Sequence, residues 1–225
     1  MTKTIPPTTF DFLNRLKNNN NRDWFNNHKP EFKQLEKELK SFFTEVFNGL
    51  NEIDKVDKMK IFRIYRDVRF SHDKTPYKTH FGCSFHRLKP RLRGGYYIHI
   101  TPNESFLATG FWNPNKQDLQ RIREEFESDA GAFRKIINDS EFKKIWGALK
   151  GEEVKTAPKG FNRIHKNIDL IKKKQYFFTK KYSEEEVLSE DFFEETLTAF
   201  SATRPYLNYM SEILTKDLNG MPLYE

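Results

Sequence analysis

The fold is decided by residues 81–112, which read F-G-C-S-F-H-R-L-K-P-R-L-R-G-G-Y-Y-I-H-I-T-P-N-E-S-F-L-A-T-G-F-W. Aromatic and β-branched residues, which favour strands, are concentrated in three short segments of this stretch, about 81–88, 95–101 and 105–112. Glycine and proline turn signals separate these segments. Because short strands joined by tight turns pair in opposite directions, the stretch predicts an antiparallel meander.

Two further segments are predicted to extend this sheet. Residues 59–70 alternate apolar and polar side chains from Phe62 to Phe70, which is the period of a strand. Residues 175–182, Q-Y-F-F-T-K-K-Y, are predicted to return as a strand after a helical region. The sequence therefore predicts an antiparallel sheet of about four to six strands.

Amphipathic helices are predicted before the sheet. From Phe32 to Leu50, apolar residues recur every three or four positions, and this spacing places them on one face of a helix. A shorter helix is expected to begin near Thr8, and another near Arg22 after the asparagine run at 18–21.

Helices are also predicted after the sheet, at about 129–137, at 140–147 and from a cap at 189–191 through Phe200. The sequence shows no internal repeat and no low-complexity linker, so we predict one α+β domain over residues 1–225, with helices packed before and after the sheet. The last helix is expected to start near Pro205, with an inner face formed by Leu207, Met210, Leu214 and Leu218.

The composition predicts a soluble protein of the cytoplasm. Charged residues make up 32% of the 225 residues, and no apolar run is long enough to span a membrane. The N-terminus lacks the apolar segment of a signal peptide. The single cysteine, Cys83, excludes an internal disulfide and fits a reducing compartment. The sequence does not indicate an oligomeric state.

The positive charge is concentrated in two segments. The chain carries a net charge of +7, whereas residues 60–95 alone carry +8 and residues 159–181 carry +7. The remainder is therefore acidic. If the two basic segments meet in space, they would create a local positive field that attracts anions.

Within the first basic segment, residues 66–80 read R-D-V-R-F-S-H-D-K-T-P-Y-K-T-H. Arginine offers a planar fork for phosphate or carboxylate, lysine offers a point charge, and hydroxyl side chains add neutral donors. The motif therefore predicts a site for a phosphate-like anion. The residues expected to form it are Arg66, Asp67, Arg69, Ser71, Asp73, Lys74, Tyr77 and Lys78.

The placement of Arg66 sharpens this prediction. In a strand over 59–70, Arg66 would lie on the apolar face, where its charge requires a carboxylate or a bound anion. The segment 73–76 is predicted to be a turn, which would bring the cations of both arms together. The alternative interpretation is that Asp67 and Asp73 each pair with an arginine, so that the motif is an internal salt-bridge network.

Two arginines outside the motif are also candidates for the site. Arg123 lies close to the core-facing stripe of its predicted helix, from where it would reach the site or lie along apolar surface. Arg163 belongs to the second basic segment and would share one side of an extended chain with His165. The alternative for this segment is a solvated basic loop.

The sequence names no reaction. It contains no nucleophile elbow and no metal-binding histidine pair, so we expect neither a metal nor a cofactor and leave open whether the protein is an enzyme. The expected partner is a phosphate-containing small molecule, or a nucleic acid stacked on Phe85, Tyr96, Tyr97 and Phe106 beside the basic block 87–93. Most phenylalanines fit core stripes, however, so core packing is the better interpretation for most of the aromatic residues. The residues that could move a proton are Tyr77, His80 and His165.

Four stretches together resemble one family. They are 12–29, I-Y-R-D-V-R-F-S-H-D-K-T-P-Y-K-T-H at 64–80, G-Y-Y-I-H-I at 95–100 and the helix with Leu119, Ile122 and Arg123. The chain is similar over about residues 9–218 to the family called domain of unknown function 2461. The resemblance implies a single cytoplasmic domain with the 66–78 positions as its signature, and it implies no reaction. Val68 departs from a position that is often polar in the family, and A-T-G-F-W at 108–112 departs from a region that is commonly glycine-rich.

Overall fold

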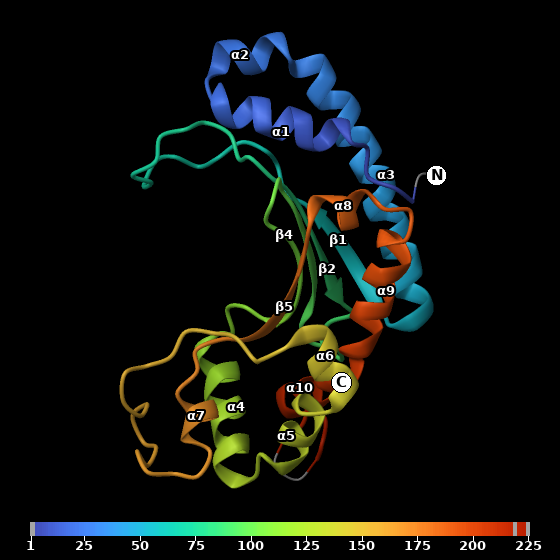
Figure 1. Ribbon diagram of the computed structural model, residues 1–225. Helices are drawn as coiled ribbons and strands as arrows, with labels where there is room; N and C mark the ends of the chain where they lie inside the picture. Colours follow the sequence, from blue (N-terminus) through green and yellow to red (C-terminus); the bar gives the residue numbers. More distant parts are fainter. Residues whose placement is uncertain (1–2, 218–219, 224–225) are drawn as a thin grey trace.

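The computed structural model describes residues 3–217 and 220–223. In this part of the chain, five antiparallel strands form one sheet in the order β1-β2-β3-β4-β5, so each strand pairs with its neighbours in sequence. Helices precede and follow the sheet (Figure 1), which confirms the predicted α+β class. The strands are β1 (Val56–Ile61), β2 (Phe81–Arg87), β3 (Gly95–Ile100), β4 (Ser105–Phe111) and β5 (Tyr176–Tyr182).

The segment after β1 differs from the prediction. β1 ends at Ile61, and residues 62–80 leave the sheet as a long loop that leads to β2. An isolated bridge pairs Tyr65 with Tyr77 across this loop, but the side chain of Phe70 is 95% exposed. Alternating side chains indicate an extended chain, whereas a strand also needs a paired neighbour. The predicted strand over 59–70 is therefore wrong beyond Ile61.

The N-terminal helices form one end of the molecule and its outer layer (Figure 1). They are α1 (Thr8–Asn18), α2 (Arg22–Asn27) and α3 (Lys29–Ile53). The predicted apolar stripe of α3 is buried from Phe32 to Leu50, and this helix contacts β1 and a later helix, α9. Asn21 begins α2, because its side chain accepts the backbone N–H of Trp24 at 2.9 Å.

The later helices surround the other end of the sheet and complete the outer layer (Figure 1). α5 and α6 lie at the predicted 129–137 and 140–147, and α9 and α10 lie where the last two helices are expected. Leu218, expected on the inner face of the last helix, lies outside the described residues. The helices are α4 (Lys116–Ser128), α5 (Gly131–Ile137), α6 (Ser140–Trp146), α7 (Ile168–Ile171), α8 (Glu184–Leu188), α9 (Phe192–Ala202) and α10 (Arg204–Thr215).

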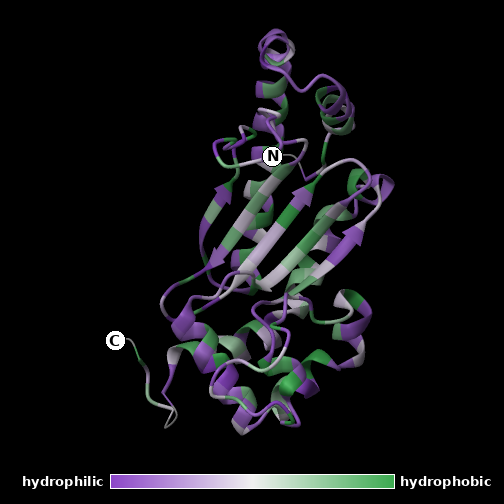
Figure 2. Ribbon diagram, turned by 90° about the vertical axis from the view of Figure 1, so that its left-hand side faces the viewer, coloured by the Kyte–Doolittle hydropathy of each residue, from purple (hydrophilic) through white to green (hydrophobic). Residues whose placement is uncertain are grey.

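The two faces of the sheet have different surroundings. On β3, Tyr96, Ile98 and Ile100 are buried in the core, whereas Tyr97 and His99 between them are only half-buried. Helices cover the first face, and Figure 2 looks onto the second face, where no helix lies in front of the strands. We call this second face the open face; it carries Lys58, Lys60, Ser84, His86, Tyr97, His99, Phe106, Ala108, Gly110, Phe177, Thr179 and Lys181.

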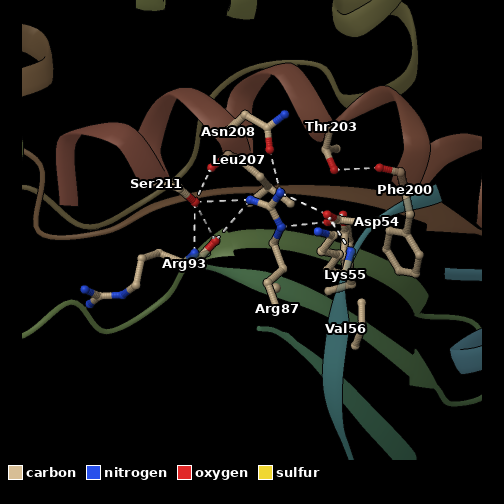
Figure 3. A network of polar contacts seen from close by, with 12 residues as sticks. Asp54, Lys55, Val56, Arg87, Arg93, Phe200, Thr203, Leu207, Asn208 and Ser211 are labelled. Atoms are coloured by element: carbon tan, nitrogen blue, oxygen red, sulfur yellow. Dashed lines mark hydrogen bonds and ion pairs between the residues drawn. The ribbon is translucent and has the colours of Figure 1, made fainter. Parts of the chain in front are cut away.

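A buried ion pair ties the covered face to the helices (Figure 3). Arg87 at the end of β2 contacts Asp54 at the end of α3, with 2.6 Å between Nε and Oδ2, and their side chains are 1% and 3% exposed. Arg87 also donates to Asn208 Oδ1 at 2.5 Å and to Ser211 Oγ at 3.2 Å, both on α10. The hydroxyl of Tyr96 donates to Asp54 Oδ2 at 2.5 Å. This network joins α3, the sheet and α10.

Candidate functional site

The loop at 62–80, which we call the β1–β2 loop, contains most of the predicted site residues. It leaves the end of the sheet next to α1 and α2 (Figure 1). Its two arms run antiparallel, because Arg66 N–H donates to Pro76 O at 2.9 Å and Lys78 N–H donates to Ile64 O at 2.7 Å. The chain thus reverses around the predicted 73–76 turn, and cations from both arms are brought to the same region.

Asn20, in the connection between α1 and α2, fixes the returning arm of this loop to the N-terminal helices. Its side-chain amide donates to Tyr77 O at 2.9 Å, and its Oδ1 accepts Tyr77 N–H at 3.1 Å. The ring of Tyr77 also stacks on Phe25 of α2, with 4.0 Å between the ring centroids. Sequence reasoning missed Asn20, because the asparagine run at 18–21 indicated only the end of a helix.

Arg66 is the centre of a polar network inside the loop. Its guanidinium forms an ion pair with Asp73, donates to Thr75 Oγ1 at 2.5 Å and reaches Ser71 Oγ at 3.5 Å. Asp73 Oδ1 accepts the backbone N–H of Thr75 at 2.9 Å, as expected for an aspartate that begins a turn. The hydrogen bond from Arg66, followed by those from Thr75, lowers the pKa of Asp73 to about 2.

A second arginine–aspartate pair lies further out on the loop. Arg69 donates from Nε to Asp67 Oδ1 at 2.9 Å and from Nη2 to Asp67 Oδ2 at 2.7 Å. This forked pair lowers the pKa of Asp67 and raises that of Arg69. The ammonium of Lys74 donates to Val68 O at 3.0 Å. Arg69 and Lys74 are therefore engaged in contacts within the loop itself.

A cleft of about 590 Å³ lies between the loop and α1. It takes in most of the 66–80 motif but not Arg69 or Lys74. Sequence reasoning did not anticipate the contribution of α1 to this cleft. The lining residues are Lys17, Asn20, Arg66, Asp67, Asp73, Thr75, Tyr77, Lys78, Thr79 and His80.

The cleft contains positive charge that its carboxylates do not neutralise. Lys78 donates to Arg63 O at 3.0 Å, and in residues 3–217 and 220–223 no carboxylate lies in ion-pair contact with its ammonium. Burial lowers the pKa of Lys78, and the nearby Arg63 and Lys60 lower it further. The pKa of His80 is lowered to about 4 by burial, Lys78 and Arg66. His80 is therefore neutral at pH 7.

His80 connects the cleft to the open face of the sheet. Its ring centroid lies 4.2 Å from that of His99, which in turn stacks on Phe106 at 4.6 Å. Tyr97 Oη lies 3.0 Å from His99 Nδ1. Burial, and then the neighbouring His80, lower the pKa of His99 to about 4. Two neutral histidines thus lie side by side, one in the cleft and one on the sheet.

The phenol of Tyr77, another candidate for moving a proton, stays protonated at neutral pH. Burial raises its pKa, Tyr65 raises it further, and Arg22 partly opposes them. The cleft therefore contains a cationic lysine and arginine, hydroxyl donors, a neutral imidazole and a protonated phenol. These groups are suited to hold an anion and to exchange a proton with it.

Arg69, Ser71 and Lys74 lie on the β1–β2 loop but outside the cleft lining, and three further predicted site residues lie outside the loop as well. Arg123 of α4 donates to Ile171 O at 3.0 Å and to Lys173 O at 3.2 Å, and burial lowers its pKa. Arg163 and His165 belong to the connection between α6 and α7, at the opposite end of the sheet (Figure 1). The two basic segments therefore do not form one cluster. Spacing along an extended chain cannot predict which end of the sheet a later segment reaches.

Two further features bear on the class of protein. No group of three or more His, Cys, Asp or Glu residues in the described ranges is placed to hold a metal ion. The helices of these ranges also include none that is both long and apolar enough to cross a membrane.

Comparison with known proteins identifies the family and no activity. The model of a family described as conserved hypothetical protein, DUF2461, matches residues 8–209, close to the 9–218 expected from the resemblance. The curated proteins and the solved structures returned no match. The family match includes the whole sheet and the 66–80 motif. The chain therefore belongs to the DUF2461 family.

Proposed function

We propose that the cleft beside the β1–β2 loop binds a phosphate-like anion. Lys78 and Arg66 would supply the charge, and the hydroxyls of Thr75 and Thr79 would supply neutral hydrogen bonds. The observation that carries the proposal is the surplus charge around Lys78. Its pKa is lowered by burial and by two other cations, and a bound anion would offset both effects.

His80 supports the same proposal independently of Lys78's own titration. Its pKa is lowered to about 4 by burial and by the charges of Lys78 and Arg66, so it experiences a positive potential inside the cleft. An anion would reverse that potential and raise the pKa of His80. Binding should therefore be accompanied by proton uptake, and the affinity should rise as the pH falls from 7 towards 5.

Arg66 has donors to share with a ligand. A guanidinium presents five N–H groups, and its contacts with Asp73, Thr75 and Ser71 come from its two terminal nitrogens. Arg69 and Lys74 would instead shape the loop through Asp67 and Val68 O. We assign the ligand contacts to the cleft and place Arg123 and Arg163 outside it.

The proposal extends to an enzyme that acts on a phosphorylated substrate. The specific observation is that His80, a neutral imidazole at pH 7, lines the same cleft as Lys78. His80 would accept a proton from the substrate, and protonated Tyr77 would donate a hydrogen bond. His165 lies at the far end of the sheet and has no place in this scheme.

The cytoplasm remains the proposed location. Cys83 is buried on β2, and burial raises the pKa of its thiol, so it is a poor nucleophile. One buried thiol without a disulfide partner suits a reducing compartment.

Binding is tested by titrating the protein with sodium sulfate and with inorganic phosphate, with sodium chloride added to keep the ionic strength constant. At ten times the dissociation constant, the anion should stabilise the fold by about 1.4 kcal/mol, or about 4 °C in melting temperature. Sulfate keeps its charge between pH 7 and 5, so a rise in its affinity over this range reports the protonation of His80.

The variant Lys78→Gln should lose most of this stabilisation. Lys74→Gln is the matched control, since it removes the same charge from the same loop at a position outside the cleft lining. Equal losses in the two variants would show a diffuse charge effect instead of a site. Stabilisation by sulfate and phosphate no greater than that by chloride at equal ionic strength would overturn the proposal.

A further inference from the structure

The open face of the sheet carries more positive than negative charge. Lys58 lies opposite His86, Lys60 opposite Ser84, and Lys181 opposite Phe106 in the strand register. The only carboxylate on the five described strands is Asp57, which lies at the register shift between Val56 and Lys58 of β1 and whose charge acts on the open-face His86. Along residues 3–217 and 220–223, none of the three lysines forms an ion pair with a carboxylate. The face therefore attracts a polyanion.

The same face carries aromatic rings in two groups. At the end near the β1–β2 loop, His99 and Phe106 stack with 13° between their ring planes, and Tyr97 lies beside them. At the other end, Trp112 is 64% exposed and its ring centroid lies 4.5 Å from that of Phe177. Rings that retain access to solvent offer surfaces on which other flat rings stack.

Small side chains separate the two aromatic groups. Ala108 and Gly110 are successive open-face residues of β4, and Thr179 lies opposite Ala108 on β5. Gly110 has a φ of +123°, and a Cβ there would come within 2.5 Å of Tyr176 O, so the backbone itself excludes a larger side chain. The side chains between the two aromatic groups are therefore short, and they leave room for a chain lying across the sheet.

Basic segments flank the face at both ends (Figure 1). The β1–β2 loop with Arg63 and Lys78 lies at one end, and the α6–α7 connection with Lys159, Arg163 and Lys166 lies at the other. The two basic segments do not meet, but both border the concave side of the sheet. A long flexible anion would contact both, whereas a small ligand in the cleft would contact one.

We propose that the open face binds single-stranded nucleic acid, with bases stacked on its aromatic rings and phosphates near its lysines. A duplex hides its base faces, and an acidic peptide would use the lysines but not the rings, so neither matches the whole surface. The inference rests on the sheet face and is independent of the cleft. It also corrects the predicted platform: Tyr97 and Phe106 lie on this face, whereas Phe85, Tyr96 and Arg87 are buried in the core.

The test is fluorescence anisotropy with a labelled 20-nucleotide oligothymidylate and a mixed-sequence RNA of the same length. Three lysine–phosphate contacts on the open face contribute a slope of about −2 to the fall of log K against log [KCl], and contacts with the flanking basic segments steepen it further. Between 50 and 200 mM KCl, the open-face contribution alone corresponds to a loss of affinity of about 20-fold.

Two variants separate charge from stacking. Lys58→Gln/Lys60→Gln/Lys181→Gln should make the salt slope shallower by about 2, whereas Lys33→Gln/Lys37→Gln/Lys40→Gln on α3 removes equal charge from the covered side and should leave the slope unchanged. Trp112→Ala should weaken binding by about tenfold through the loss of one stacked base, with the slope retained.

Equal affinity for a duplex of the same length, or for polyglutamate, would overturn the proposal in favour of a general polyanion surface. The absence of binding at 50 mM KCl would also overturn it. Lys78→Gln distinguishes the two proposals. Loss of sulfate stabilisation, with an oligonucleotide affinity lowered only by the one lost phosphate contact, keeps both proposals. Oligonucleotide binding by the unchanged protein without any sulfate effect keeps only this one.

Discussion

Two arginine–aspartate pairs of this protein have the same chemistry in opposite surroundings. Arg87 and Asp54 have side chains 1% and 3% exposed, and Arg87 also donates to Asn208 and Ser211 of α10 (Figure 3). Arg66 and Asp73 have side chains 26% and 56% exposed in the β1–β2 loop. The comparison shows that the core encloses one pair, whereas the other is open to solvent beside the cleft.

The pKa values of the two aspartates reflect this difference. Burial alone would raise the pKa of Asp54, but hydrogen bonds from Arg87 and Tyr96 outweigh it and lower the pKa. The pKa of the exposed Asp73 is lowered to about 2, chiefly by the hydrogen bond from Arg66. In both cases the ionised form is favoured in the folded state, but only Asp54 would be left as a buried charge without its arginine.

The largest effect is expected from Arg87→Met, which should lower the free energy of unfolding by about 3–5 kcal/mol. The variant leaves the Asp54 carboxylate buried without its ion-pair partner and removes the hydrogen bonds to Asn208 and Ser211. Urea unfolding monitored by circular dichroism measures the change.

A double variant identifies the cause of this loss. Arg87→Met/Asp54→Asn replaces the buried charge with a neutral amide and should regain part of the stability lost in the single variant. If the double variant is less stable than Arg87→Met alone, an unpaired charge is not what destabilises it, and the structural role assigned to the buried pair fails.

The sequence predicts the sheet well, but it does not predict the pair of Arg87 with Asp54. It gives the pairing of Asp67 and Asp73 with arginines as one of its two interpretations of the motif, and both pairs are present in the structure. Four strands and the main helices follow from periodicity, since alternation and turn residues report local conformation. The partner of an arginine depends on tertiary distance, so the sequence placed Arg66 on an apolar strand face and assigned Arg87 to a basic surface block. The role of Asn20 was not predicted for the same reason, because its contact with Tyr77 joins residues that lie 57 positions apart in the sequence.

A smaller loss of stability is expected when the contact between Asn20 and the β1–β2 loop is removed. Asn20→Ala removes both hydrogen bonds to the backbone of Tyr77 and should cost about 1–2 kcal/mol. Hydrogen exchange should show faster exchange of the Tyr77 amide with little change in the β2–β4 amides. The exposed Asn18→Ala is the control, and equal protection of Tyr77 in both variants would show that Asn20 does not hold the loop.

The smallest effect on stability is expected from Arg66→Ala, because its partner Asp73 is 56% exposed and solvent screens the pair. The same variant should reduce sulfate binding strongly, since Arg66 lines the cleft. Below pH 4 the two proteins should converge in stability. The lowered pKa of Asp73 stabilises the fold only above the ordinary pKa of an aspartate, and this contribution is lost as the pH falls through about 2.

Arg66→Ala also decides between the two interpretations of the motif. If the 66–80 motif is an internal salt-bridge network, the variant should melt at a markedly lower temperature and sulfate should have no effect on either protein. If Arg66 serves a ligand, the melting temperature without anion should be nearly unchanged and the shift produced by sulfate should shrink. Arg69→Ala provides the comparison, because its pair with Asp67 is still more exposed and Arg69 lies outside the cleft lining. An Arg69 variant that loses sulfate binding as fully as the Arg66 variant would place the anion on the outer loop and not in the cleft.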